Sequence, residues 1–238
     1  MSLLIVDVAV YSAAEPEASA LLVEDGVIAW HGPLATAAAL FAGTPRLDAA
    51  GCLVTPSFVD ALPGKAPRTE QDDAALGITD RVEDCDSPLL RLAPHQGLDH
   101  SLLELSRMGR AFAFGSHGAA VSPWEWVRAA AVDPPPEERI SVRAAFLAAT
   151  RGGRRLLGQP HPGSLVPGAP ADLVVWEPWD LTVRGNDERI QTCSTDPRSR
   201  TPMLPDLSTS ETPRPWLTLK HGRIVADAGQ LTIPVGAR

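Results

Sequence analysis

Cysteine is scarce in this sequence. The number and spacing of the cysteines bear on the cellular compartment and on whether the chain forms disulfides or a cysteine zinc site. The 238 residues contain only Cys52, Cys85 and Cys193, which are widely spaced, and no Cys-x-x-Cys pair occurs. A disulfide framework or a cysteine zinc site needs paired or closely spaced cysteines. Both are therefore disfavoured, and the sequence predicts a protein of a reducing compartment, the cytoplasm.

Lysine is scarcer still, and positive charge is in deficit. Lys65 and Lys220 are the only lysines, and the formal net charge is -8 at pH 7. Nucleic-acid binding needs clustered lysine and arginine, so this class of partner is disfavoured. No apolar run reaches the ~20 residues that span a bilayer. The opening residues MSLLIVDVAV lack the basic flank of a signal peptide. We therefore expect neither a nucleic-acid partner nor a membrane partner.

Proline and glycine, in contrast, are plentiful. The chain has 23 prolines and 19 glycines, and 44% of its residues are hydrophobic. This combination indicates a globular, turn-rich fold with many short strands. Residues 1–58 and 162–238 show β patterns, whereas residues 59–161 alternate between β and α patterns, which is typical of a parallel sheet. We predict an α/β protein in which both chain ends share one sheet, with the middle inserted.

Several local signals predict individual turns and helix ends. Residues 25–26 (Asp-Gly) and 221–222 (His-Gly) each separate two apolar strands, as the turn of a β-hairpin does. Ser122 and Ser141 precede helical patterns and are predicted to cap them. We expect the helix after Ser141 to break at the glycine pair 152–153.

Several separate stretches of the chain match the motifs of one known family. Near the N-terminus these are LLVEDGVIAWHGP and GCLVTPSFVDA. Later in the chain they are GRAFAFGSHGAAVSPWEWVRAAAV, VRAAFLAATRGGRRLLG, GSLVPGAPADLVVWEP and LKHGRIVADAGQ. Together they resemble the amidohydrolase superfamily, which consists of metal-dependent hydrolases, and the first of the later stretches most resembles its amidohydrolase-3 branch. The stretches occur in the order that the family has them.

The resemblance implies a (β/α)8 barrel joined to a β-sandwich that both chain ends build. Such a barrel takes ~250 residues, whereas the stretch from Val59 to Gln159 is only about 100 residues long. We therefore predict a composite β-sandwich from residues 1–58 and 162–238, and a truncated, incomplete TIM-barrel-like α/β part at 59–161. The short polar linker DALPGKAPRTEQ, which begins at Asp60, stands where the family has several further strands.

The resemblance also implies three metal-ligand motifs, and all three are altered. Where the family has Asp-x-His-x-His, the chain reads FVDALPGK: Asp60 matches, but Leu62 and Gly64 stand at the histidine positions. In RVEDC, Asp84 stands where histidine is expected, and in GSHG, His117 stands where aspartate is expected. Activating a metal-bound water needs converging histidine and carboxylate ligands. Asp84, His117 and Asp60 are the candidate metal ligands that are left, and Asp84 and His117 are the candidate catalytic residues.

Two functions follow from these motifs. One is an amidohydrolase-family protein that has lost its metal site and activity, needs no cofactor and acts as a binding or assembly protein. The other is a hydrolase of carbon–nitrogen bonds other than peptide bonds, with an atypical Asp84 and His117 site and a divalent metal such as zinc. An open half-barrel also exposes strand edges. A homo-oligomer, a partner subunit or a rearranged compact layer is expected to cover them, and a small molecule is a further candidate ligand.

Three histidines and two tryptophans in the middle of the chain are further candidates for a functional role. His95, His100 and His117 lie close together in the sequence, but their spacing matches no zinc pattern, so we interpret His95 and His100 as solvated residues near a helix end. Trp124 and Trp126 point to different faces of one predicted helix. We expect one of them in the core and the other at an interface.

Overall fold

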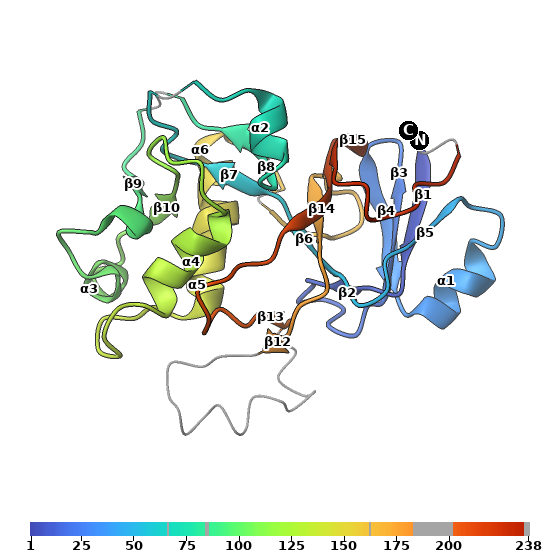
Figure 1. The fold of residues 1–238 in the computed structure, drawn as a ribbon, viewed down its shortest axis with the longest axis horizontal. Coiled ribbons are helices and arrows are strands. Elements are labelled where there is room, and N and C mark those ends of the chain that lie inside the picture. Colours follow the sequence, from blue (N-terminus) through green and yellow to red (C-terminus); the bar gives the residue numbers. More distant parts are fainter. Residues whose placement is uncertain (66, 84–85, 162, 183–201, 236–238) are drawn as a thin grey trace.

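The fold is described from a computed structural model, for residues 1–65, 67–83, 86–161, 163–182 and 202–235. Figure 1 shows a β-rich lobe and a lobe in which helices surround short strands. The predicted mixed α/β class is confirmed. Within the described ranges, no helix combines the length and the apolar character that crossing a bilayer requires.

Four strands of the N-terminal segment form the first sheet, in the order β4-β3-β1-β5. They are β1 (Ser2–Val6), β3 (Ala20–Glu24), β4 (Val27–Gly32) and β5 (Arg46–Asp48), and helix α1 (Leu34–Leu40) follows β4. The hairpin turn between β3 and β4 is the predicted one. Asp25 and Gly26 have φ of 49° and 85°, which is the left-handed pair that a two-residue turn requires.

The second sheet contains strands from both ends of the chain, in the order β15-β14-β11-β6-β2. They are β2 (Ala9–Val10), β6 (Leu53–Pro56), β11 (Leu173–Trp176), β14 (Pro215–Lys220) and β15 (Arg223–Asp227). Strand β11 pairs antiparallel with β6 on one side and with β14 on the other. The prediction that distant β segments share one sheet is therefore confirmed. Strands β12 (Leu181–Thr182) and β13 (Leu204–Pro205) form a separate pair.

Apolar side chains of these two sheets belong to one core. Leu3 of β1 and Leu21 of β3 lie in the same buried cluster as Val54, Leu173 and Leu217 of the second sheet. All five are 0% exposed. Burying apolar side chains in such a shared cluster is a main source of stability.

The described residues in the middle of the chain form four short strands, β7 (Phe58–Asp60), β8 (Ile78–Arg81), β9 (Leu90–Leu92) and β10 (Phe112–Phe114). Strand β7 pairs in parallel with β8, and β9 in parallel with β10. Two backbone hydrogen bonds join these pairs: Ala61 N–H donates to the Phe114 carbonyl (3.1 Å), and His117 N–H donates to the Leu62 carbonyl (2.6 Å). The result is an open layer, β8-β7-β10-β9, whose strands end at one common edge.

Helices pack against this open layer. They are α2 (Glu70–Ala74), η1 (Pro94–Gln96), α3 (Leu102–Arg107), α4 (Pro123–Ala131), α5 (Val142–Leu147), the π-helical turn η2 (Ala148–Gly152) and α6 (Gly153–Leu156). Ser122 and Ser141 cap α4 and α5 as predicted. Phe58 of β7 makes edge-to-face contacts with Trp124 and Trp126. Both tryptophans are 0% exposed, so the prediction that one of them faces an interface is wrong.

The helix after Ser141 does not break at the glycine pair, contrary to the prediction. Helix α5 continues through η2 into α6, and both glycines keep helical backbone angles. A Cβ on Gly152 would lie 2.9 Å from the Ala113 Cβ, and one on Gly153 would lie 2.5 Å from Val59 Cγ1. These glycines therefore allow close packing of helix on strand, which local sequence does not reveal.

A buried ion pair links α6 to the β-rich lobe. Arg154 is 2% exposed, and its Nη1 lies 3.2 Å from Asp172 Oδ2, just before β11. Asp172 Oδ1 accepts the backbone N–H of His221 (2.7 Å) in the β14–β15 turn. Arg154 also donates to the Ser57 hydroxyl. Because Ser57 directly precedes β7, this network orients the strand that carries the candidate site.

Candidate functional site

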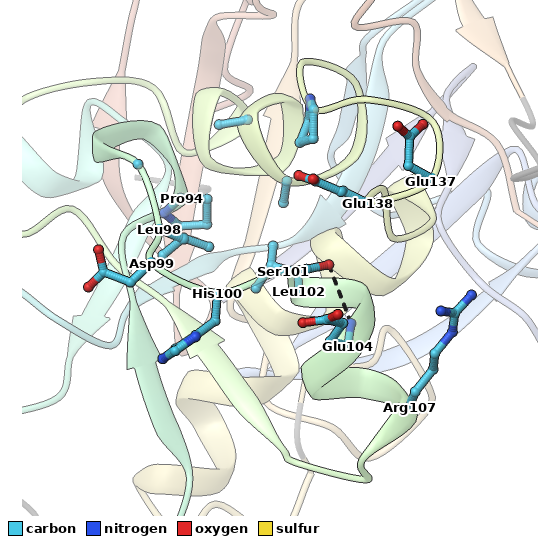
Figure 2. A pocket seen from close by; sticks show the side chains of 14 residues that line it. Pro94, Leu98, Asp99, His100, Ser101, Leu102, Glu104, Arg107, Glu137 and Glu138 are labelled. Atoms are coloured by element: carbon cyan, nitrogen blue, oxygen red, sulfur yellow. Dashed lines mark hydrogen bonds between the residues drawn. The ribbon is translucent and has the colours of Figure 1, made fainter.

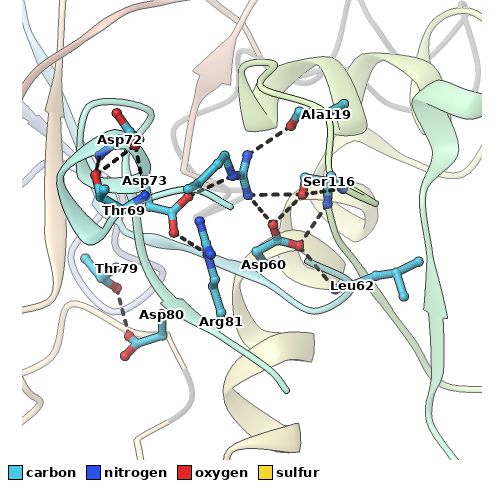
Figure 3. Close-up of polar contacts among 12 residues, drawn as sticks. Asp60, Leu62, Thr69, Asp72, Asp73, Thr79, Asp80, Arg81, Ser116 and Ala119 are labelled. Atoms are coloured by element: carbon cyan, nitrogen blue, oxygen red, sulfur yellow. Dashed lines mark hydrogen bonds and ion pairs between the residues drawn. The ribbon is translucent and has the colours of Figure 1, made fainter. Parts of the chain in front are cut away.

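Asp60, the last residue of β7, lies at the centre of a buried polar cluster (Figure 3). Its side chain is 0% exposed. Oδ1 accepts the backbone N–H groups of Ser116 (2.9 Å) and Leu62 (3.2 Å). Oδ2 accepts the Ser116 hydroxyl and Arg68 Nη2, each at 2.5 Å. A carboxylate offers about four lone-pair sites, so the protein itself fills the acceptor capacity of Asp60.

Arg68 supplies a cation to this cluster. Its Nη2 also donates to the Ser116 hydroxyl oxygen (3.1 Å), and its Nη1 donates to the Ala119 carbonyl (2.9 Å). Its Nε forms an ion pair with Asp73 Oδ1 at 3.2 Å, and the side chain is 7% exposed. The next residue, Thr69, caps α2 through a capping box, which fixes the backbone that carries Arg68.

A second arginine balances the charge. Arg81, at the end of β8, forms an ion pair with Asp73 Oδ2. Contact with the Asp73 carboxylate raises the pKa of the Arg81 guanidinium above its ordinary value. Asp60 and Asp73 thus face Arg68 and Arg81, and the formal charges of the four groups cancel. Buried charges persist in proteins when they are paired in this way. These four residues and Ser116 are called the Asp60 cluster below.

Two glycines let the turns after β7 and β10 approach each other closely. A Cβ on Gly115 would lie 2.5 Å from Asp60 Oδ1 and 2.8 Å from Leu62 Cα. Gly64 has φ of +61°, and a Cβ there would lie 2.5 Å from the Gly118 backbone nitrogen. A larger residue at either position would force the two turns apart.

His117 adjoins the Asp60 cluster, but its ring contacts Gln96, which lies outside the cluster. Its φ of 47° is uncommon for a residue with a Cβ. Its Nδ1 lies 2.7 Å from Gln96 Oε1.

His95 of η1 places Nε2 3.2 Å from the Ser116 carbonyl oxygen and stacks on Trp126. Partial burial lowers the pKa of His95, which favours its neutral form. His95 is therefore not the solvated residue that the sequence predicted.

The residues that the structure describes at this edge do not fit a divalent metal. Leu62 and Gly64 offer no side-chain ligand, and Asp60 already accepts four hydrogen bonds. A histidine at position 64 would also collide with the Gly118 backbone. Across the described ranges, no three or more His, Cys, Asp or Glu side chains gather closely enough to hold an ion. Metal sites of hydrolases need several such ligands to converge, and here Arg68 stands among the carboxylates instead.

The structure describes two of the three predicted ligand positions. Asp60 ends β7, and His117 lies three residues after the end of the neighbouring strand β10. Asp84 lies outside the described residues, so its pairing with His117 stays a prediction. The sequence does not identify Arg68 as a site residue, because it lies in a stretch with the pattern of a polar linker. The Thr-x-x-Asp spacing that begins at Thr69 is a helix-start signal. It locates α2, yet nothing local shows that the preceding arginine reaches β7.

A separate cavity of about 650 Å³ lies beside α3 and the end of α4 (Figure 2). Its lining includes the buried Pro94, Leu102 and Ala130 and the acidic side chains of Asp99, Glu104, Glu137 and Glu138. His100 also lines it, whereas His95 and His117 adjoin the Asp60 cluster. Small-molecule sites span roughly 300–1,000 Å³, so this cavity has the size of one.

The fold resembles those of several solved structures. Enamidase, described as a member of the amidohydrolase superfamily, aligns with a TM-score of 0.66 and 13% identity, over 98% of each chain. D-hydantoinase aligns with a TM-score of 0.55 and 12% identity, over 98% of this chain and 97% of that one. Guanine deaminase of E. coli aligns with a TM-score of 0.55 and 13% identity, over 95% and 98%. These values define a mixed α/β protein with an amidohydrolase-like fold.

Sequence comparison gives the family itself. Residues 100–226, more than half of the chain, match the model of the amidohydrolase family. The chain therefore belongs to the amidohydrolase family, as its motifs suggested. No curated protein matches the sequence.

Acidification from about pH 7.5 to about pH 5.5 is expected to lower the stability of the wild-type protein more than that of a His95→Gln variant. The pKa of His95 is lowered from 6.5 in the folded protein. The unfolded chain therefore takes up this proton first, and stability falls as the pH drops through about 6.5. Urea unfolding midpoints of both proteins at both pH values measure this. Equal shifts in the two proteins would contradict it.

Proposed function

We propose that this protein is an amidohydrolase-family member without a working metal centre, and that it acts as a binding or assembly protein. The observation that carries the proposal is the state of Asp60. The family resemblance makes Asp60 a metal ligand, yet its oxygens accept hydrogen bonds from Arg68, Ser116 and Leu62. A metal hydrolase lowers the pKa of a bound water to about 7, and that requires a metal held by several protein ligands.

The domain organisation is part of the same proposal. Residues 1–58 and 162–238 form the composite β-sandwich, and residues 59–161 are the reduced barrel. A second copy or a partner subunit covers the open edges of the β8-β7-β10-β9 layer, because exposed strand edges invite pairing. The cavity beside α3 offers a place for a small molecule, which a binding role needs.

Metal analysis tests the proposal. The purified protein, prepared without chelator and after incubation with Zn, Mn or Fe salts, is expected to contain no stoichiometric metal by elemental analysis. Native mass measurement on the same samples reports the oligomeric state. One equivalent of metal that is lost in a His117→Ala or an Asp84→Ala variant would overturn the proposal, because such an ion would have ligands at the altered motifs.

The second candidate is a hydrolase of carbon–nitrogen bonds other than peptide bonds. One observation favours it: His117 holds a left-handed backbone at the carboxyl end of β10, and strained backbone of this kind concentrates at functional sites. In this reading Asp84 and His117 would together hold a metal such as zinc or form an Asp-His pair that transfers a proton. Hydrolysis of simple amides and cyclic imides that is lost in His117→Ala, but kept in His100→Ala, would support it.

A further inference from the structure

We infer that the Arg68 guanidinium takes the place of the metal cation, so that the family's ion site has become a permanent, arginine-centred structural site. This inference rests on the proposed loss of the metal centre and goes beyond it, because it names what replaced the ion. Arg68 Nη2 contacts Asp60 at 2.5 Å and the Ser116 hydroxyl at 3.1 Å. Asp60 belongs to the first altered motif and Ser116 to the third. One guanidinium thus joins Asp60 to Ser116, the residue directly before His117, which stands at the ligand position of the third motif.

Charge makes a cation obligatory at this position. Asp60 is 0% exposed and Asp73 is 7% exposed, and both contact Arg68. Without Arg68, Asp60 would keep its backbone and hydroxyl donors but would lose its cation. A buried carboxylate without an opposite charge is strongly disfavoured. Arg81 reaches Asp73 from the other side and does not replace the contact with Asp60.

The shape of the guanidinium matters as much as its charge. Its two terminal nitrogens donate to Asp60, to Ser116 and to the Ala119 carbonyl, and its Nε faces Asp73. This planar fork serves acceptors that lie in different directions, whereas a lysine offers one ammonium group at a single point. The structure therefore assigns the site to a guanidinium in particular.

The connection that carries Arg68 is also the one that is too short for further barrel strands. Only the stretch from Ala61 to Thr69 separates β7 from α2. The capping box at Thr69 anchors α2, and Arg68 directly precedes it. A longer connection with additional strands would carry this position away from the end of β7. The segment that is too short for further barrel strands therefore also positions the Arg68 guanidinium beside Asp60.

Chemical rescue of Arg68→Ala tests the inference. The variant is expected to unfold about 10 °C below the wild type, because a buried ion pair loses one partner. Low millimolar methylguanidinium is expected to recover part of this loss saturably, while tetramethylammonium at the same concentration does not. Arg46→Ala, at an exposed position of β5, is the matched control and should neither lose stability nor respond. Arg68→Lys should recover less than half of the loss.

Two results with the single variant would overturn the inference. One is an Arg68→Ala variant that unfolds at the same temperature as Arg46→Ala. The other is an Arg68→Ala variant that zinc or manganese stabilises and methylguanidinium does not. If Arg68→Ala fails to fold, the Asp60→Asn/Arg68→Ala double variant should fold, since the unpaired charge is gone, and its failure would also count against the inference. Metal content of the wild type tests the proposed function separately, so a failure of the inference can be distinguished from a failure of the proposed function.

Discussion

Replacing Gly115 with alanine is expected to destabilise the protein by about 3 kcal/mol or more, which is at the upper end for overpacking of a buried site. The added Cβ would lie 2.5 Å from Asp60 Oδ1 and closer still to the Leu62 backbone nitrogen. Neither atom can move freely, because both take part in the hydrogen bond that Asp60 accepts from Leu62. The turn after β10 must therefore retreat from the turn after β7, and the Asp60 cluster opens.

Urea unfolding measures this loss, with Gly43→Ala as the matched control. No atom lies within 4 Å of a Cβ built on Gly43, so its change should stay within about 0.5 kcal/mol. A Gly115→Ala protein as stable as Gly43→Ala would show that the two turns are not held together as described. Tryptophan fluorescence adds a local readout, since Trp126 stacks on His95 and His95 contacts the Ser116 carbonyl.

Features fixed by neighbouring residues could be predicted from the sequence. The Asp25–Gly26 turn places two left-handed residues between strands, and its residue types alone indicate this. Ser122 and Ser141 cap their helices through contacts two or three residues away. The motif changes at Leu62 and Gly64 could also be recognised, because leucine and glycine have no ligand atom whatever their surroundings.

Features that depend on distant segments could not be predicted. Arg68 contacts Ser116, and the two are separated by 48 positions in the sequence. The pattern that marks Arg68 as linker is the same whether its side chain enters solvent or a buried carboxylate pair. The glycine pair at 152–153 resembles a helix end, yet its lack of side chains serves contact with β10 and β7. In both cases a tertiary contact overrides the local signal.

Altered metal motifs can be recognised in the sequence, whereas the proposed substitute cation cannot. Absence of a ligand is a property of one residue. A substitute cation is a property of a fold, because it requires a short connection, a capped helix and two carboxylates in one place. Arg68, Thr69 and Asp73 supply the cation, the helix cap and one carboxylate within a span of six residues, and the end of β7 supplies the second carboxylate, Asp60.

Asp60→Ala is expected to cost about 3–5 kcal/mol of stability, the range for removing one partner of a buried ion pair. Arg68 would keep its contacts to Asp73 and Ala119 but would lose its shortest partner, and the Ser116 N–H and hydroxyl would lose their acceptor. Urea unfolding measures the loss, and Asp99→Ala, at an exposed position of the cavity wall, is the control with a small expected change.

The way this loss responds to metal distinguishes a structural cluster from an ion site. In an ion site, a chelator should destabilise the wild type and leave Asp60→Ala unaffected, because the variant has no ion to lose. In an arginine-centred cluster, the wild type and Asp60→Ala should both ignore the chelator, and the difference between them should stay constant. A difference that shrinks when metal is removed would mean that Asp60 stabilises the fold through an ion, and Arg68 would then be a neighbour of that ion rather than its substitute.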